Sequence, residues 1–156
     1  MLQYAIRTLS EGAVQIDSEL ATDDGVWLEG DARPLTSVKV TGRLSGAGSG
    51  RYYFSGGIRG FVAGECRRCL VPLEFVVQSD VHLIYVDADD ETADEPDVYP
   101  LAEPGTTLDL RPAIREQWLL DASVLPLCQP DCKGLCPMCG AELNTGPCAC
   151  TTSSRN

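Results

Sequence analysis

The sequence predicts an α+β fold: a β-rich antiparallel sheet or small barrel, one packed helix, and a C-terminal tail stapled by its cysteines. Strand-like stretches follow one another through residues 1–86, where apolar and polar residues alternate. A single helix-like stretch covers 107–126, and six of the eight cysteines lie in the tail that follows it. The 156 residues suit a single domain, with the tail as its small appendage.

The β-rich region is predicted over residues 1–86. Its stretch SGAGSG (45–50) is expected to form a hairpin turn or loose loop, because glycine reaches positive φ at little cost. Several short strands with turns between them favour an antiparallel sheet or a small barrel. The last strand is long enough to be one bulged strand or two. The predicted strands are VWLEG (26–30), SVKVTGRL (37–44), RYYF (51–54), IRGFVAGEC (58–66) and LEFVVQSDVHLIYV (73–86).

The acidity of the chain is concentrated in one segment. The net charge is -11, and residues 87–109 alone carry nine acidic side chains and no basic one. Residues 87–106 are therefore predicted to form a mobile acidic loop. Because the remainder of the chain is close to neutral, the total charge does not by itself exclude a nucleic-acid partner.

The helix is predicted over residues 107–126. Asp109 suits the N-cap, because its carboxylate can accept the free N–H groups of the first turn. Pro112 falls in that turn, where it removes no helical hydrogen bond, and Pro126 ends the helix. One apolar face predicts packing on the sheet. That face comprises Leu110, Ala113, Ile114 and Trp118, widened by Leu119 and Leu120.

The cysteine spacing in the tail, 127–156, and in ECRRC predicts zinc. CPMCG (136–140) has the form of a zinc knuckle, a tight turn whose backbone N–H groups stabilise two thiolates. Zinc takes four ligands in a tetrahedron, so eight cysteines predict two zinc ions in closed, structural sites. By chain neighbourhood the ligands are Cys66, Cys69, Cys128 and Cys132 (site 1) and Cys136, Cys139, Cys148 and Cys150 (site 2).

Other interpretations of the cysteines are open but less favoured. A rival pairing joins Cys128 and Cys132 to Cys136 and Cys139, which leaves Cys66 and Cys69 with the last two cysteines. The N-terminal residues do not resemble a secretory signal, so the cytoplasm is expected, where thiols stay reduced and disulfides are rare. A thioredoxin-like redox pair opens a helix after a strand, a setting that is missing here. Iron–sulfur clusters also take four cysteines, but paired knuckles suit zinc better.

No catalytic constellation is recognisable. His82, the one histidine, lies in strand-like sequence without an evident catalytic partner. There is no phosphate-binding loop with a lysine–serine ending and no G-x-S-x-G nucleophile turn. No segment approaches the roughly 18 to 20 apolar residues of a membrane span. The sequence therefore predicts a protein that is not an enzyme and has no membrane partner.

Residues 39–68 form a basic stretch with Glu65 as its one acidic residue. Basic groups neutralise phosphates, and aromatic rings such as those of Tyr53 and Phe61 can stack on unpaired bases. The ordinary alternative is that the aromatic residues are core and the arginines lie on solvated strand faces. The candidate RNA-binding residues are Lys39, Arg43, Arg51, Arg59, Arg67 and Arg68.

Two stretches resemble the bacterial YceD family, also called large ribosomal RNA subunit accumulation protein. They are ECRRCLVPLEF (65–75) and DLRPAIREQWLLDASVLPLCQPDCKGLCPMCGAELNTGPCAC (109–150). The resemblance implies a cytoplasmic, non-enzymatic factor for 23S rRNA accumulation or processing and large-subunit assembly. Its partners would be precursor 23S rRNA, an assembly intermediate or a ribosomal protein. Two other functions stay open: a zinc-stabilised module that docks a basic protein, and a thiol-disulfide oxidoreductase.

Overall fold

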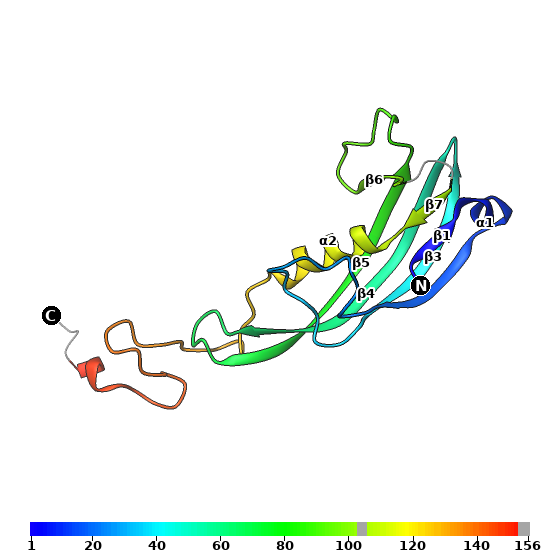
Figure 1. Cartoon of the computed structure of the whole chain (residues 1–156). Coiled ribbons are helices and arrows are strands. Elements are labelled where there is room, and N and C mark those ends of the chain that lie inside the picture. Colours follow the sequence, from blue (N-terminus) through cyan, green and yellow to red (C-terminus); the bar gives the residue numbers. More distant parts are fainter. Residues whose placement is uncertain (103–105, 153–156) are drawn as a thin grey trace. The chain divides into compact units, whose positions relative to one another are not determined.

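A computed structural model describes residues 1–102 and 106–152 (Figure 1). Glu103, part of the predicted acidic loop, lies outside the described residues. The α+β, β-rich class predicted from the sequence is confirmed. In chain order the elements are β1 (Gln3–Ala5), α1 (Ile6–Glu11), β2 (Val14–Leu20), β3 (Val38–Gly48), β4 (Arg51–Glu65), β5 (Pro72–Val86), β6 (Val98–Pro100), β7 (Thr107–Asp109), α2 (Arg111–Ala122) and the short 3₁₀ helix η1 (Ala149–Thr152).

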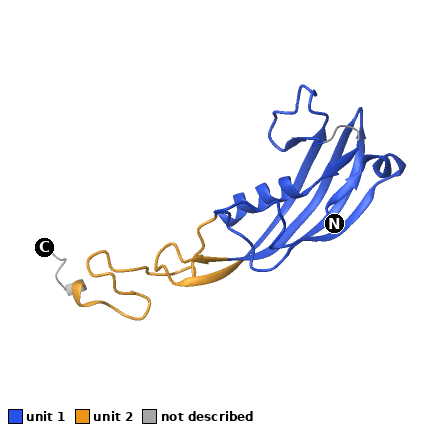
Figure 2. Ribbon diagram, viewed as in Figure 1, with its two compact units in different colours: residues 1–62, 76–123 blue, residues 63–75, 124–156 orange. Residues whose placement is uncertain are grey.

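The chain divides into two compact units (Figure 2). Unit 1 comprises residues 1–62 and 76–123, and unit 2 comprises 63–75 and 124–156. Unit 1 contains both helices and most of the sheet, whereas unit 2 contains all eight cysteines. That the whole chain forms a single domain stays a prediction.

The main sheet has five strands in the order β2-β3-β4-β5-β6. β2 pairs with β3 and β3 with β4 in antiparallel fashion, while β6 lies parallel to β5. β1 and β7 form a separate two-stranded antiparallel sheet. Within the described residues the main sheet is open, with β2 and β6 at its edges, so the sheet and not the barrel is the correct alternative.

The predicted acidic loop is partly structured. Val98–Pro100 forms β6, which pairs with the end of β5 through Ile84 and Val98. In the turns before it, the Asp90 carboxylate accepts hydrogen bonds from the Thr92 backbone N–H and hydroxyl at 2.9 and 2.6 Å. These local bonds give an acidic stretch a defined path, which its composition did not predict.

The hairpin between β3 and β4 is tighter than predicted. β3 continues to Gly48 and β4 begins at Arg51, so the loop is Ser49 and Gly50 alone. Both have positive φ, 53° and 73°, as in the two-residue turns whose twist matches that of paired strands. β5 is a single strand over Pro72–Val86, which settles the question of one strand or two.

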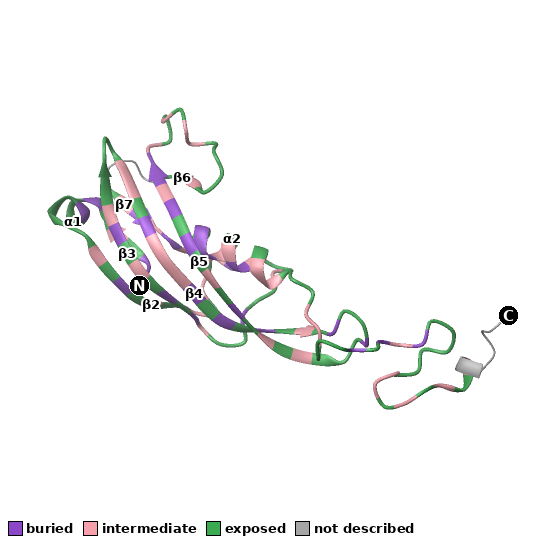
Figure 3. Ribbon diagram, turned by 180° about the vertical axis from the view of Figure 1, so that it is seen from behind, coloured by how far each residue is buried: buried purple, intermediate pink, exposed green. Residues whose placement is uncertain are grey.

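Buried residues alternate with more exposed ones along the middle of this hairpin (Figure 3). Val40 and Leu44 of β3 and Phe54 and Ile58 of β4 are buried on the inner face. Their neighbours point to the opposite face, because successive strand residues project to opposite sides. Those outward residues include Lys39, Arg43, Tyr53, Arg59 and Phe61.

Helix α2 packs on the inner face, as its apolar stripe predicts. Trp118 is fully buried, and a Cβ placed on Gly60 of β4 would lie 2.8 Å from the Trp118 ring. Only glycine therefore allows this close approach. The helix begins at Arg111 with Leu110 as its N-cap, so the predicted N-cap Asp109 is wrong. Asp109 ends β7, although its carboxylate still accepts the Arg111 backbone N–H at 3.0 Å.

The predicted strand VWLEG (26–30) is wrong. The segment turns, because carboxylates beside it take its backbone N–H groups: Asp24 accepts from Val26 at 2.9 Å and Asp31 from Leu28 at 2.8 Å. Arg115 of α2 then pairs with Asp31 at 2.7 Å. Short acidic side chains that bond nearby backbone compete with strand formation.

The sequence also left α1 unpredicted. This short helix buries Ile6 and Leu9, a spacing of three residues that fits one helical turn but is too short to be recognised. No helix in residues 1–102 and 106–152 is both long and apolar enough to cross a membrane.

Candidate metal centres

Two turns in unit 2 have the same backbone hydrogen bonds. In the first, the Leu70 N–H donates to the Cys66 carbonyl at 2.9 Å and the Cys66 N–H to that of Val71 at 3.0 Å. In the second, Gly140 donates to Cys136 and Cys136 to Ala141, both at 2.8 Å. ECRRC therefore folds as the same knuckle as CPMCG.

The two knuckles differ at one backbone position. The residue after the second cysteine has positive φ in both, 62° at Leu70 and 74° at Gly140. Glycine takes this conformation freely, whereas an L-residue with a side chain is strained there by roughly 1–2 kcal/mol. The first knuckle accepts this strain and leaves Leu70 exposed.

The cysteines gather into two groups of four, in the first of the two pairings considered above. Cys66, Cys69, Cys128 and Cys132 form one group, and Cys136, Cys139, Cys148 and Cys150 the other. Within each group the sulfur atoms lie within 4.8 Å of one another. Each group could hold a metal ion, and we keep the names site 1 and site 2 for them.

The sulfur separations in site 1 suit a tetrahedral metal. The Cys66 and Cys132 Sγ atoms are 3.7 Å apart, and those of Cys69 and Cys128 are 3.6 Å apart. Four sulfurs about 2.3 Å from a central zinc would be roughly 3.8 Å from one another. A disulfide needs about 2.05 Å, so neither of these two sulfur pairs is a disulfide.

Backbone N–H groups favour a thiolate at Cys66 in site 1 and at Cys136 in site 2. Burial opposes the charged form of Cys66, but backbone N–H groups of Cys69 and Cys128 outweigh it and lower its pKa to about 6. The backbone N–H of Cys139 is the main cause that lowers the pKa of Cys136 to about 7. Beside it, the Cys139 sulfur and burial raise the pKa of Cys150 to about 11. A divalent cation would remove this repulsion between neighbouring thiolates.

Asn144 supports site 1 from outside its four cysteines. Its side-chain amide donates to the Cys132 sulfur at 3.3 Å and lowers the pKa of that thiol. Its oxygen in turn accepts the Lys133 backbone N–H at 2.9 Å. Asn144 is not among the ligands predicted from the sequence, so this contact was missed. Residues that bond a ligand atom commonly orient metal sites.

Most of the buried residues of unit 2 are cysteines. Among its described residues the buried ones are Cys66, Cys69, Cys132, Cys136 and Gly134. Around the first three pack only partly buried leucines, namely Leu73, Leu127 and Leu135. Such a small apolar cluster does not stabilise a fold of this size unaided. The donor set and its placement fit a structural metal ion in each site.

The segment that contains both cysteine groups matches a known protein family. The family described as large ribosomal RNA subunit accumulation protein YceD matches residues 54–156. The chain belongs to the YceD family. The matched range contains all eight cysteines and helix α2, and it confirms the resemblance found in the sequence.

Curated relatives of this YceD-family chain come from bacteria and a plant. Uncharacterized proteins of Mycobacterium bovis and Mycobacterium tuberculosis are 35% identical over 134 residues, which cover 82% of this chain and 57% of theirs. The large ribosomal RNA subunit accumulation protein YCED homolog 1, chloroplastic, of Zea mays is 27% identical over 154 residues, or 78% of this chain and 49% of that one. The chain thus spans about half the length of these relatives. No solved structure matches it.

The six candidate RNA-binding residues of this YceD-family chain are divided between the units. Arg67 and Arg68 lie in the first knuckle, where the Arg68 guanidinium donates to the Cys132 carbonyl at 2.9 Å. In unit 1, Arg51 pairs with Asp90 at 3.3 Å and Lys39 pairs with Asp17. Lys39, Arg43 and Arg59 point from the outer face of the sheet.

The aromatic residues of the basic stretch are divided between the core and the outer face of the sheet. Phe54 is buried in the core, whereas Tyr53 and Phe61 on the outer face are 37% and 39% exposed. The Arg59 guanidinium lies 5.5 Å from the centre of the Phe61 ring. Tyr53 stacks on His82 of β5, with ring centres 6.2 Å apart. His82 could not be connected with this face from the sequence, because the register of β5 is set by tertiary pairing.

Proposed function

We propose that the protein is a non-enzymatic ribosome biogenesis factor. It would promote 23S rRNA accumulation or processing and large-subunit assembly in the cytoplasm, by binding precursor rRNA or an assembly intermediate. The observation that carries this proposal is the family match over residues 54–156. The printed name of the maize relative, a large ribosomal RNA subunit accumulation protein homologue, supports the same process.

Zinc is the metal that we propose for both sites. Four thiolates at tetrahedral spacing suit zinc, and a site closed by four sulfurs leaves no position for a catalytic water. The role of the metal is therefore to hold unit 2 in shape. It would also occupy the thiols that an oxidoreductase would need free.

Metal analysis of cysteine variants tests the two sites. The native protein should contain two zinc ions per chain. Replacing Cys66, Cys69, Cys128 and Cys132 together by serine should leave one ion, whereas the rival pairing would leave none. Protein purified without metal that carries a reducible disulfide would contradict the zinc proposal and favour the oxidoreductase.

Association with ribosomal particles tests the function itself. Tagged protein should co-sediment with large-subunit precursors in a sucrose gradient, and purified protein should shift fragments of precursor 23S rRNA in a gel. Because phosphate contacts displace counterions, the shift should weaken as salt rises. Failure of both, at low salt and in the gradient, would overturn the proposal.

An alternative is a protein-interaction module that uses the acidic segment. In residues 87–97, Asp90 is engaged by Arg51, while the side chains of Asp89, Glu91 and Glu95 include exposed carboxylates suited to a basic ribosomal protein. Deleting 87–97 would weaken such docking. Direct RNA binding should be unchanged or should improve, because like charge is removed.

A further inference from the structure

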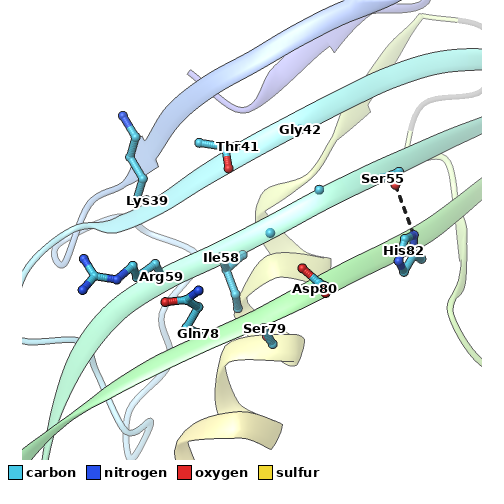
Figure 4. Close-up of a pocket in the computed structure, with 12 residues that line it drawn as sticks. Lys39, Thr41, Gly42, Ser55, Ile58, Arg59, Gln78, Ser79, Asp80 and His82 are labelled. Atoms are coloured by element: carbon cyan, nitrogen blue, oxygen red, sulfur yellow. Dashed lines mark hydrogen bonds between the residues drawn. The ribbon is translucent and has the colours of Figure 1, made fainter.

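The outer face of the main sheet contains a hollow that none of the assignments above explains (Figure 4). It is open, measures about 660 Å³ and lies across β3, β4 and β5 of unit 1. Helix α2 lies on the other face of the sheet, where Trp118 meets Gly60. The residues that line the hollow include Lys39, Thr41, Arg59, Asp80 and His82, and Gly57 lies at its floor.

The hollow exists because a residue without a side chain occupies its centre. Gly57 occupies an outward-facing position of β4, and it pairs with Thr41 of β3. A Cβ on Gly57 would lie 3.9 Å from a carboxylate oxygen of Asp80. The Asp80 carboxylate thus borders the empty space, as Figure 4 shows, and offers acceptors for N–H groups of a ligand.

The two ends of the hollow differ in chemistry. Lys39 and Arg59 are cross-strand partners at one end, and they supply positive charge. At the other end, the Ser55 hydroxyl and the Tyr53 hydroxyl lie 3.2 and 2.8 Å from His82 Nδ1. Tyr53 stacks on the His82 ring at an interplanar angle of 12°. A ligand with both an anionic group and a flat, N–H-bearing ring fits this sequence of groups.

We propose that this hollow binds an unpaired nucleotide of a single-stranded RNA segment, and that the segment lies along β4. Lys39 and Arg59 would bind a phosphate, Asp80 would accept N–H groups of the base, and Tyr53 and Phe61 would stack on neighbouring bases. Open sheet faces with exposed aromatic rings bind unpaired bases in this way. The bases of a duplex are already stacked on one another, so they cannot stack on these rings. The inference rests on the proposed function and names the surface and the kind of RNA.

Asp80 gives the proposal a base preference. Cytosine, adenine and guanine present an exocyclic amino group, which a carboxylate accepts well. Uracil has no exocyclic amino group, and its one ring N–H lies between two carbonyl oxygens that a carboxylate repels. Segments whose unpaired bases carry amino groups should therefore bind more tightly than oligouridine.

Binding of labelled 12-nucleotide strands to the zinc-loaded full chain tests the inference. Fluorescence anisotropy at low salt should show single strands binding at least about tenfold more tightly than the matching duplex, since stacking is worth about 1–3 kcal/mol per base. Filling the hollow through Gly57→Val or Thr41→Trp should reduce affinity by a similar factor. Asp80→Asn should abolish the preference over oligouridine.

Matched controls make the outcome decisive. Arg7→Gln removes an exposed charge of unit 1 that does not line the hollow, and it should change the affinity by less than about twofold. Arg59→Gln should lower the affinity and make binding less dependent on salt. Gly57→Val places its Cβ 3.2 Å from the Ser79 carbonyl oxygen. Should that variant fail to fold, Thr41→Trp, at an exposed position, decides instead.

The inference and the proposed function fail in different ways. If filled variants bind single strands like the unmodified chain, or duplex binds equally well, the hollow is not the site, although co-sedimentation with precursors would still support the function. If the hollow binds single strands but the protein never joins precursor particles, the function is overturned and the binding site stands.

Discussion

Unit 1 buries aliphatic and aromatic side chains, whereas unit 2 buries cysteines. Phe54, Trp118 and Leu83 are among the largest fully buried side chains of unit 1. Unit 2 has Cys66, Cys69, Cys132 and Cys136 in the equivalent role. The first unit can be stabilised by removal of apolar surface from water. The second has little such surface to remove, so the zinc ions proposed for its two sites would supply most of its stability.

This difference can be measured separately in each unit. Both tryptophans of the chain, Trp27 and Trp118, are buried in unit 1. Tryptophan fluorescence therefore reports on unit 1, whereas released metal reports on unit 2.

Removal of the metal should unfold unit 2 alone. Structural zinc contributes about 10–16 kcal/mol in small peptides, far more than the few buried groups of unit 2 can replace. A strong chelator should make residues 124–150 sensitive to protease while tryptophan fluorescence stays unchanged. Loss of the fluorescence signal together with the metal would show that the two units do not differ as described.

Phe54→Ala should destabilise unit 1 by about 3–5 kcal/mol, as large-to-small core substitutions of phenylalanine do. The zinc content should stay the same. The matched control is Tyr53→Ala, because Tyr53 is the adjacent residue but points to the outer face. Urea titrations followed by fluorescence should show a large drop for the first variant and a small one for the second.

Asn144→Ala should weaken metal binding at site 1 by about 10- to 100-fold, the usual effect of losing a residue that bonds a ligand atom. Thr145→Ala is the control, since the Thr145 hydroxyl bonds only the Glu142 carbonyl. Competition with a metal-binding dye should release one of the two ions earlier in Asn144→Ala. Identical release curves for both variants would remove Asn144 from the site.

Acid should weaken unit 1 through its carboxylate–arginine pairs. The Arg115 guanidinium holds the pKa of Asp31 below its usual range. A lowered folded-state pKa means that the stabilisation is present above the unfolded pKa of about 4 and is lost as pH falls through the folded value. Asp31→Asn should therefore melt earlier than the unmodified protein at pH 7, and the gap should close as the pH falls through the lowered folded-state pKa. Asp89→Asn, an exposed carboxylate, should show no such gap.

The sequence predicted those parts of the fold that depend on local pattern. Alternation identified β3 and β5, and the apolar stripe identified the helix that contains Trp118. The strand predicted at VWLEG is wrong because the alternation of apolar and polar residues does not show that neighbouring carboxylates accept its backbone N–H groups. Those carboxylates are Asp24 and Asp31. The tight turn at Ser49 was also missed, since strand pairing extended through glycines that usually end strands.

The candidate sites divide in the same way. C-x-x-C spacing predicted the knuckles and, with neighbourhood, the four cysteines of each group. It could not predict that Asn144 reaches the Cys132 sulfur, because that contact depends on how the loop folds back. Nor could it place Asp80 beside Gly57 or His82 beside Ser55, because the pairing of β4 with β5 is set by the whole sheet.

The two metal sites close chain loops of very different length. The sulfurs of Cys139 and Cys148 come from a short local segment, whereas Cys69 and Cys128 are separated by 59 positions. Loop closure costs about 0.6 kcal/mol more for each doubling of length. Site 2 should therefore take up its ion early, even on an otherwise unfolded chain, and site 1 only after the strands and α2 have formed. Cobalt added to the unfolded chain during refolding should bind in two resolved phases. The second phase, at site 1, would then report that folding is complete.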